Sequence, residues 1–191
     1  MNTPHAAHDI HLLRSGVALF PALIEAFDQA QHEVLLETYI FDFAGASGQV
    51  AQALVRAAQR GVRVCVVVDG VGTGALPPEW AQCFQQAGVQ CRVYSPLAGL
   101  GFWLPSRWRR LHRKLCVVDR AVAFCGGINL LDDFIDPNVP GGLDQPRLDY
   151  GVSLRGPLVT HVHDAMSQLW SRIEAVRELR SQDISGALDA L

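Results

Sequence analysis

Val62–Val68 constrains the fold more than any other stretch of the sequence, because it is a nearly unbroken β-branched run. Apolar side chains at consecutive positions, rather than at alternate ones, are typical of a strand that is buried on both faces. Such strands lie in the interior of a sheet that helices cover on both sides. This run therefore predicts an α/β protein.

The segments around this run alternate between strand and helix patterns. From Glu33 to Tyr94 we expect a strand, a helix, a strand, a helix and a strand, over Glu33–Ile40, Gln49–Gln59, Val62–Val68, Pro77–Ala87 and Val89–Tyr94. Short right-handed crossovers of this kind join parallel strands and place helices on the faces of the sheet. The expected fold is a largely parallel mixed sheet flanked by helices on both faces.

Further elements are expected on either side of this region. The sequence predicts an entry strand, a helix, two short strands in a hairpin, a strand and a long helix, over His8–Leu13, Val17–Ala30, Leu115–Val118, Ala121–Phe124, Tyr150–Leu154 and Val159–Leu179. Together they make one domain, residues 9–179. Residues 180–191 are expected to form a weakly patterned C-terminal tail, as in a truncated chain.

Composition excludes some classes of protein. The formal net charge of -3 excludes a globally basic nucleic-acid binder but allows a local basic patch. The N-terminal residues are polar, and no long uncharged apolar run occurs, so we expect neither a signal peptide nor a transmembrane helix. The five cysteines form no C-x-x-C pair, and we expect reduced thiols, no metal site and no cofactor.

A cluster suited to phosphoryl transfer lies in the second half of the chain, at His112, Lys114, Gly126, Gly127 and Asn129. Residues two apart on a strand project to the same face, so His112 and Lys114 would meet the same ligand. A neutral imidazole can attack phosphorus, while an ammonium and an amide stabilise charge on the non-bridging oxygens. The glycine pair lets backbone approach the ligand closely. These groups supply the positive field, so the chemistry needs no metal.

With Asp119 included, the spacing is H-x-K-x4-D-x6-G-G-x-N, which resembles the signature of the phospholipase D superfamily. The likeness extends to Leu36–Phe41, Gly61–Gly70 and Asp149–Pro157. In these stretches the chain is similar to the first half of bacterial cardiolipin synthases. The resemblance covers about Asp9 to Arg172, and it implies a phospholipase D-like domain.

The resemblance also implies roles for individual residues. His112 would be the nucleophile or its partner acid, and Lys114 and Asn129 would bind phosphate. Asp149 would hold the second nitrogen of the histidine, which fixes its tautomer. Asp119 belongs to the catalytic motif, although we expect its role to be mainly structural, in the turn. The expected substrate-binding residues are Glu37, Gly126 and Gly127.

Members of the superfamily use two such motifs, so that one histidine attacks and the other protonates the leaving alcohol. This sequence holds one H-x-K-x4-D, and the second motif is expected from a homodimer partner or a missing C-terminal half. The implied activity is phosphatidyl transfer from phosphatidylglycerol through a phosphohistidine, as in cardiolipin synthesis. Two alternatives stay open: a homodimeric, metal-independent phosphodiesterase or nuclease, and a half-enzyme fragment without activity.

A basic and aromatic stretch precedes the motif, at Trp103, Arg107, Trp108, Arg109 and Arg110. It suits a membrane patch that attracts anionic headgroups and inserts tryptophan, and a nucleic-acid phosphate track would look similar. Together with the resemblance, it predicts phosphatidylglycerol as the partner and a peripheral position on the cytoplasmic face of the inner membrane. Nucleic acid is the expected partner only in the nuclease alternative.

Two polar loops have simpler explanations. Asp132, Asp133 and Asp136 fit no EF-hand spacing, so we expect a solvated, helix-capping loop. Asp69 and the glycines after it lack the lysine of a Walker phosphate loop, so we expect a structural loop near the pocket.

Overall fold

The computed structural model describes residues 8–95, 110–137 and 139–189, with side chains as far as residue 179. In chain order the elements are β1 (Asp9–Arg14), α1 (Ser15–Gln29), β2 (Glu33–Thr38), α2 (Gly45–Gln59), β3 (Arg63–Asp69), α3 (Pro78–Ala87), β4 (Gln90–Tyr94), β5 (Leu115–Val118), β6 (Val122–Gly126), β7 (Tyr150–Arg155) and α4 (Leu158–Asp189). Each lies where the sequence predicts an element. α4 runs on to Asp189, through most of the segment expected to form a tail.

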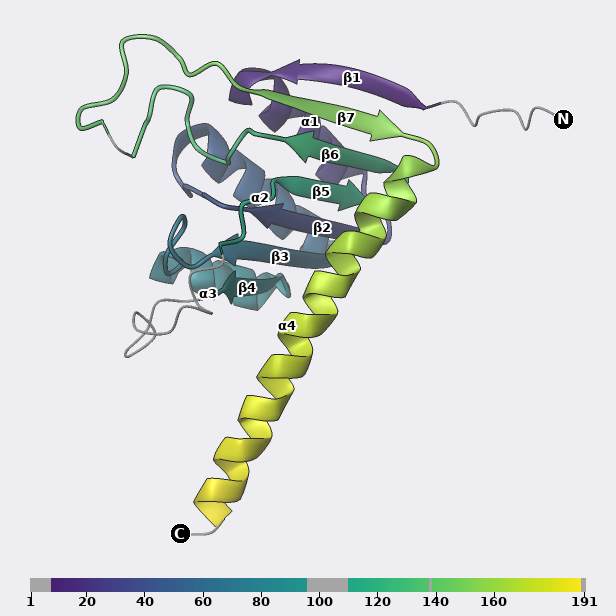
Figure 1. The fold of residues 1–191 in the computed structure, drawn as a ribbon, viewed down its shortest axis with the longest axis vertical. Coiled ribbons are helices and arrows are strands. Elements are labelled where there is room, and N and C mark those ends of the chain that lie inside the picture. Colours follow the sequence, from purple (N-terminus) through teal and green to yellow (C-terminus); the bar gives the residue numbers. More distant parts are fainter. Residues whose placement is uncertain (1–7, 96–109, 138, 190–191) are drawn as a thin grey trace, which may run out of the picture.

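The strands form one seven-stranded sheet in the order β1-β7-β6-β5-β2-β3-β4 (Figure 1). β2, β3 and β4 are parallel, as the alternation of strands and helices predicts. The other four pairings are antiparallel. A mixed sheet is therefore confirmed, but the prediction that it is largely parallel is wrong. The crossover pattern ends at β4, and β5 and β6 are joined by a tight turn, which only antiparallel strands allow.

Helices cover both faces of the sheet, as predicted. One core lies between the sheet and α1, α2 and α3, and the other lies under α4. Val64, Val66 and Val68 of β3 belong to the first core, while Cys65 and Val67 belong to the second. The β-branched run is therefore buried on both faces. Figure 1 shows α4 crossing the front of the sheet and continuing past β4.

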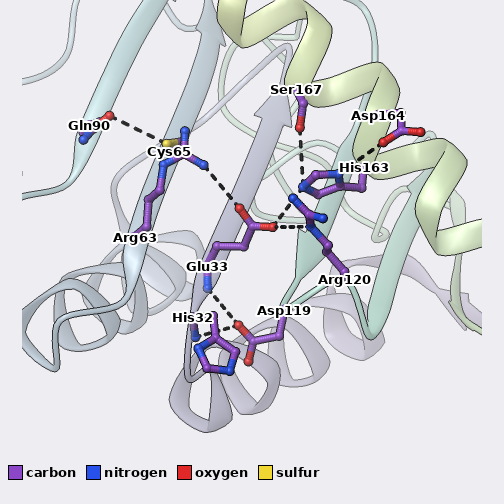
Figure 2. Close-up of polar contacts among 10 residues, drawn as sticks. All are labelled: His32, Glu33, Arg63, Cys65, Gln90, Asp119, Arg120, His163, Asp164 and Ser167. Atoms are coloured by element: carbon purple, nitrogen blue, oxygen red, sulfur yellow. Dashed lines mark hydrogen bonds and ion pairs between the residues drawn. The ribbon is translucent and has the colours of Figure 1, made fainter.

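A polar cluster attaches the first half of α4 to the sheet (Figure 2). Glu33 of β2 lies 2.9 Å from Nε2 of the buried His163 in α4. The same carboxylate lies 3.2 Å from Arg63 and 3.2 Å from Arg120. Glu33 therefore links α4, β3 and the β5–β6 turn, at the end of the sheet where β2 begins.

The acidic loop 132–136 caps α1. Asp133 accepts hydrogen bonds from the backbone N–H groups of Gly16, at 3.0 Å, and Val17, at 3.2 Å. A carboxylate at a helix N-terminus satisfies N–H groups that have no partner inside the helix, and it complements the helix dipole. The helix-capping role predicted for this loop is confirmed. The described residues hold no group of three or more side chains that could bind a metal ion.

Candidate active site

The described site residues, apart from Asp119, lie in or beside strand ends that meet at one end of the sheet. β2 and β6 end there, and β5 and β7 begin there (Figure 1). The register fixes this meeting, because Glu37 pairs with Leu115, Leu115 with Cys125, and Gly126 with Gly151. The segments just outside these strands therefore bring their side chains together.

His112 and Lys114 lie side by side immediately before β5. Lys114 Nζ is 3.2 Å from His112 Nδ1 and donates a hydrogen bond to the His112 carbonyl at 3.1 Å. The imidazole is exposed and the lysine is half-buried. An imidazole and an ammonium thus face the same space, as their spacing predicts.

Tyr39 is a member of this cluster that the sequence pattern did not single out. Its ring centroid lies 4.7 Å from that of His112 and 5.4 Å from Lys114 Nζ, which is within cation–π range. Thr73 donates a hydrogen bond to the Tyr39 carbonyl at 3.0 Å, which holds the end of β2 in place. In the sequence, only the position of Tyr39 just past β2, two residues after Glu37, could have indicated that it belongs to the site.

Asp149 lies near Lys114. Burial lowers the pKa of Lys114, and the charge of Asp149 opposes that shift. The Asp149 carboxylate accepts the Tyr150 N–H at 2.7 Å, and a Cβ at Gly127 would overlap it. Gly127 therefore leaves the space that the Asp149 carboxylate occupies.

The expected hydrogen bond between Asp149 and His112 is absent from this structure. His112 Nδ1 faces Lys114 Nζ instead, and no hydrogen bond joins Asp149 to the imidazole within the described part of the chain. Lys114 thus lies against the imidazole, and the charge of Asp149 acts on Lys114.

Asn129 reaches the same corner from the segment after β6. Its Oδ1 accepts the Ile40 N–H at 3.1 Å, and its amide nitrogen donates to no residue within the described ranges. Gly126, at the end of β6, donates its N–H to the Lys114 carbonyl at 3.3 Å. A Cβ at Gly126 would overlap the backbone of Tyr150 and Gly151. The glycine pair therefore makes its close contacts with β7 and Asp149.

Asp119 lies at the opposite end of β5 from His112, in the turn to β6. Its carboxylate accepts backbone N–H groups of Gln31 at 2.7 Å, and of His32 and Glu33 at 2.8 Å each (Figure 2 draws the contacts with His32 and Glu33). Burial raises the pKa of Asp119, but these hydrogen bonds outweigh it and lower the pKa. The structure therefore brings the motif's histidine and lysine together and leaves its aspartate outside the site.

Glu37 is buried in β2 and lies 2.7 Å from Arg113 Nη2. Neither of its carboxylate oxygens accepts a hydrogen bond of normal geometry from a described residue, so the contact is an ion pair only. Burial raises the pKa of Glu37 to about 7, although Arg113 opposes the shift. Glu37 therefore contacts the residue between His112 and Lys114 in the chain.

Asp69, at the end of β3, holds the backbone just before His112. This fully buried carboxylate accepts the N–H of Leu111 at 2.7 Å and that of Val71 at 2.8 Å, and Arg110 lies 3.5 Å away. The structural role expected for this loop agrees with these contacts. The bond to Leu111 spans 42 positions of the sequence, so no local pattern could predict it.

Most of the predicted membrane patch lies outside the described residues, namely Trp103, Arg107, Trp108 and Arg109. Arg110 is described, and it donates hydrogen bonds to Ser95 in addition to its contact with Asp69. No helix in the described ranges is long and apolar enough to cross a bilayer.

Comparison with known protein families shows which family the chain belongs to. Residues 23–139, more than half of the chain, match the family model described as "Cardiolipin synthase, PLD-like domain". The chain belongs to this family. The resemblance seen in the sequence is thereby confirmed.

Individual members of the cardiolipin synthase group are similar to most of the chain. Cardiolipin synthase B from Shigella flexneri and from Escherichia coli (strain K12) are each 36% identical over 153 residues, which are 80% of this chain and 36% of the relative. Cardiolipin synthase A from Pseudomonas fluorescens (strain SBW25) is 32% identical over 177 residues, 91% of this chain and 35% of the relative. The chain thus spans about a third of the length of these curated relatives.

Solved structures confirm the phospholipase D-like fold. Nuc, a phospholipase D family member from Salmonella typhimurium, matches with a TM-score of 0.59 and 18% identity, over 86% of this chain and 95% of its own. NucT from Helicobacter pylori matches with a TM-score of 0.60 and 15% identity, over 88% of this chain and 97% of its own. At these identities the likeness is one of fold alone.

Proposed function

We propose that this domain carries one half of a phosphatidyltransferase site of the cardiolipin synthase type, with His112 as the nucleophile. The observation that carries the proposal is the contact between an exposed imidazole and a half-buried ammonium at 3.2 Å, in a member of the cardiolipin synthase PLD-like family. The proposed donor is phosphatidylglycerol, since the relatives are named for cardiolipin synthesis.

In the first step, an imidazole nitrogen of His112 attacks the phosphorus of phosphatidylglycerol. A P–N bond forms, the P–O bond to glycerol breaks, and an acid protonates the departing alkoxide. Lys114 and the amide nitrogen of Asn129 bind the non-bridging oxygens as negative charge builds on them. Because a bound phosphate takes up the donors of Lys114, the imidazole is released from its contact with that ammonium.

In the second step, the hydroxyl of another phosphatidylglycerol attacks the phosphohistidine. The P–N bond breaks, cardiolipin forms, and the hydroxyl proton passes to a base. A second histidine is needed as this acid and base, because His112 is occupied by the phosphoryl group. We infer that a second motif supplies it, from another copy of the domain or from a longer chain. The complex would act at the cytoplasmic face of the inner membrane, bound peripherally.

Trapping the intermediate tests the proposal directly. The protein is mixed with vesicles of phosphatidylglycerol labelled in its phosphate and quenched with alkali, and the labelled residue is mapped by mass spectrometry. We expect an acid-labile label on His112, no label in His112→Ala, and a normal label in His161→Ala, a control at an exposed histidine of α4. A label on another residue, or cardiolipin produced by His112→Ala, would refute the proposal.

A second candidate function is favoured by one observation, the single H-x-K-x4-D in the sequence. Two copies of this chain would supply two identical motifs, as a homodimeric phosphodiesterase or nuclease requires. Incubation with single- and double-stranded DNA and RNA in EDTA separates the candidates, because the second predicts cleavage that His112→Ala abolishes. A protein that takes up no label and cleaves no nucleic acid is the half-enzyme without activity.

A further inference from the structure

A hollow of about 270 Å³ opens between α4 and the segment 110–113, at the same end of the sheet as the active site. Its polar lining is cationic: Arg110, Arg113 and Arg172 face it, together with Gln168 and His112. We call it the arginine hollow. Arg113 and His112 belong also to the surroundings of the catalytic cluster, so the hollow and the cluster adjoin.

Two of the three arginines have a buried carboxylate close to the guanidinium group, which partly neutralises their charge. Arg113 pairs with Glu37 at 2.7 Å, and Arg110 lies 3.5 Å from Asp69. Arg172 is different, because it is exposed on α4 and makes no ion pair or hydrogen bond with any described residue. Its charge is available to an anion from solution.

The pair between Arg113 and Glu37 leaves Arg113 able to bind a second anion. The arginine side chain is 40% exposed, and a guanidinium has five N–H donors, of which Glu37 approaches one nitrogen. Because burial raises the pKa of Glu37 to about 7, part of its charge is lost near neutral pH. An anion in the hollow would then face an arginine that Glu37 neutralises only in part.

We propose that the arginine hollow is a second anion-binding site, which holds a phosphate group beside the one that reacts at His112. Guanidinium groups pair with phosphate oxygens through two parallel N–H bonds, and three of them line the hollow with an amide donor from Gln168. A compact tetrahedral dianion or phosphodiester fits a space of this volume.

A role for this site in substrate binding rests on the proposed function. A phosphodiester at His112 and a second phosphate in the arginine hollow would place the two phospholipids of the transfer on one domain. The second phosphate could also come from free phosphate in solution. The chemistry of recognition is the same for both sources, and competition between phosphate and vesicles distinguishes them.

Binding of inorganic phosphate by isothermal titration calorimetry tests the site without any turnover. The titration uses the full chain with His112→Ala and Lys114→Ala, which weakens the catalytic cluster as a competing phosphate site. Adding Arg172→Gln should weaken phosphate binding on the order of tenfold, the cost of one charge-assisted contact. Arg172→Lys should restore most of the affinity. Arg177→Gln is the matched control, since Arg177 lies on α4 outside the hollow and pairs with Glu174.

Competition identifies the source of the phosphate. Phosphatidylcholine vesicles, to which binding should not depend on Arg172, are the control. If phosphate displaces the protein from phosphatidylglycerol vesicles but not from the control vesicles, the hollow binds a lipid headgroup. If phosphate binds through Arg172 without affecting vesicle binding, it takes free phosphate. The proposal fails if the double variant binds no phosphate, or if Arg172→Gln and Arg177→Gln bind it equally well. Loss of activity in His112→Ala has no bearing on this result, so the two proposals fail independently.

Discussion

Substitution of Asp119 tests whether this residue of the motif stabilises the fold or takes part in catalysis. Its carboxylate accepts three backbone N–H groups that join the turn after β5 to the start of β2. Because these groups are partly open to water, each bond contributes about 1 kcal/mol rather than the larger value of a buried charged bond. Asp119 also has a φ of 51°, where alanine costs about 1 kcal/mol more than aspartate or asparagine.

These magnitudes separate two variants. Asp119→Ala loses all three bonds and takes on the backbone strain, so its free energy of unfolding should fall by about 4 kcal/mol. Asp119→Asn keeps the oxygen that His32 and Glu33 share, loses only the bond to Gln31, and should fall by about 1 kcal/mol. For a chain of this size, the melting temperature should drop by about 10 °C and about 3 °C respectively.

Thermal unfolding followed by circular dichroism, at several pH values, measures both effects. The pKa of Asp119 is lowered in the folded protein, so its contribution is fully present above the unfolded pKa and is lost as the pH falls through the folded pKa. The difference between Asp119→Asn and the wild type should therefore shrink in acid. Phosphohistidine formation well below the melting temperature should be unchanged in Asp119→Asn. An unchanged melting temperature together with loss of the phosphohistidine would show that Asp119 acts in catalysis and that our reasoning is wrong.

Three further predictions concern the neighbours of His112. Glu37→Gln should remove a pH dependence of stability. The pKa of Glu37 is raised from 4.5 to about 7, so the free energy of unfolding of the wild type should fall by about 3 kcal/mol as the pH rises through that window. Urea unfolding at several pH values should show a smaller change for the variant. Gly127→Ala should displace the Asp149 carboxylate, which its Cβ would overlap, and lower kcat by more than tenfold with a melting temperature within a few degrees of wild type. Unchanged single-turnover kinetics would contradict this. Tyr39→Leu should remove the ring that contacts His112 and Lys114, costing about 1 kcal/mol, a fivefold loss in the labelling rate of His112, whereas Tyr39→Phe should label normally.

The sequence predicted a structural feature correctly where a local pattern of residues has only one physical explanation. The apolar run of β3 could be satisfied only by burial on both faces, and the spacing of His112 and Lys114 placed the two side chains together. The hairpin at Asp119 also followed from local chain chemistry, since aspartate tolerates a positive φ.

Other features depend on contacts between distant parts of the chain, and local patterns could not reveal them. The antiparallel half of the sheet follows from how β5 lies against β2, which neither strand specifies alone. Asp69 ends β3 and Tyr39 lies just past β2, and the neighbours of both strands were unknown, so their contacts with Leu111 and His112 were not predicted. The position of Asp149 near Lys114 depends on two strand pairings together, that of β5 with β6 and that of β6 with β7.

Asp69 has a consequence for how relatives of this domain can diverge. Tyr94 accepts the N–H of Gly70 at 2.8 Å and pairs with Asp69 in the sheet, and the carboxylate of Asp69 accepts the N–H of Leu111. The residues that flank the stretch 96–109 are thus clamped to one short piece of β3. Changes of length within that stretch should therefore leave the backbone just before His112 in place, because the hydrogen bonds at Tyr94 and Leu111 do not depend on it.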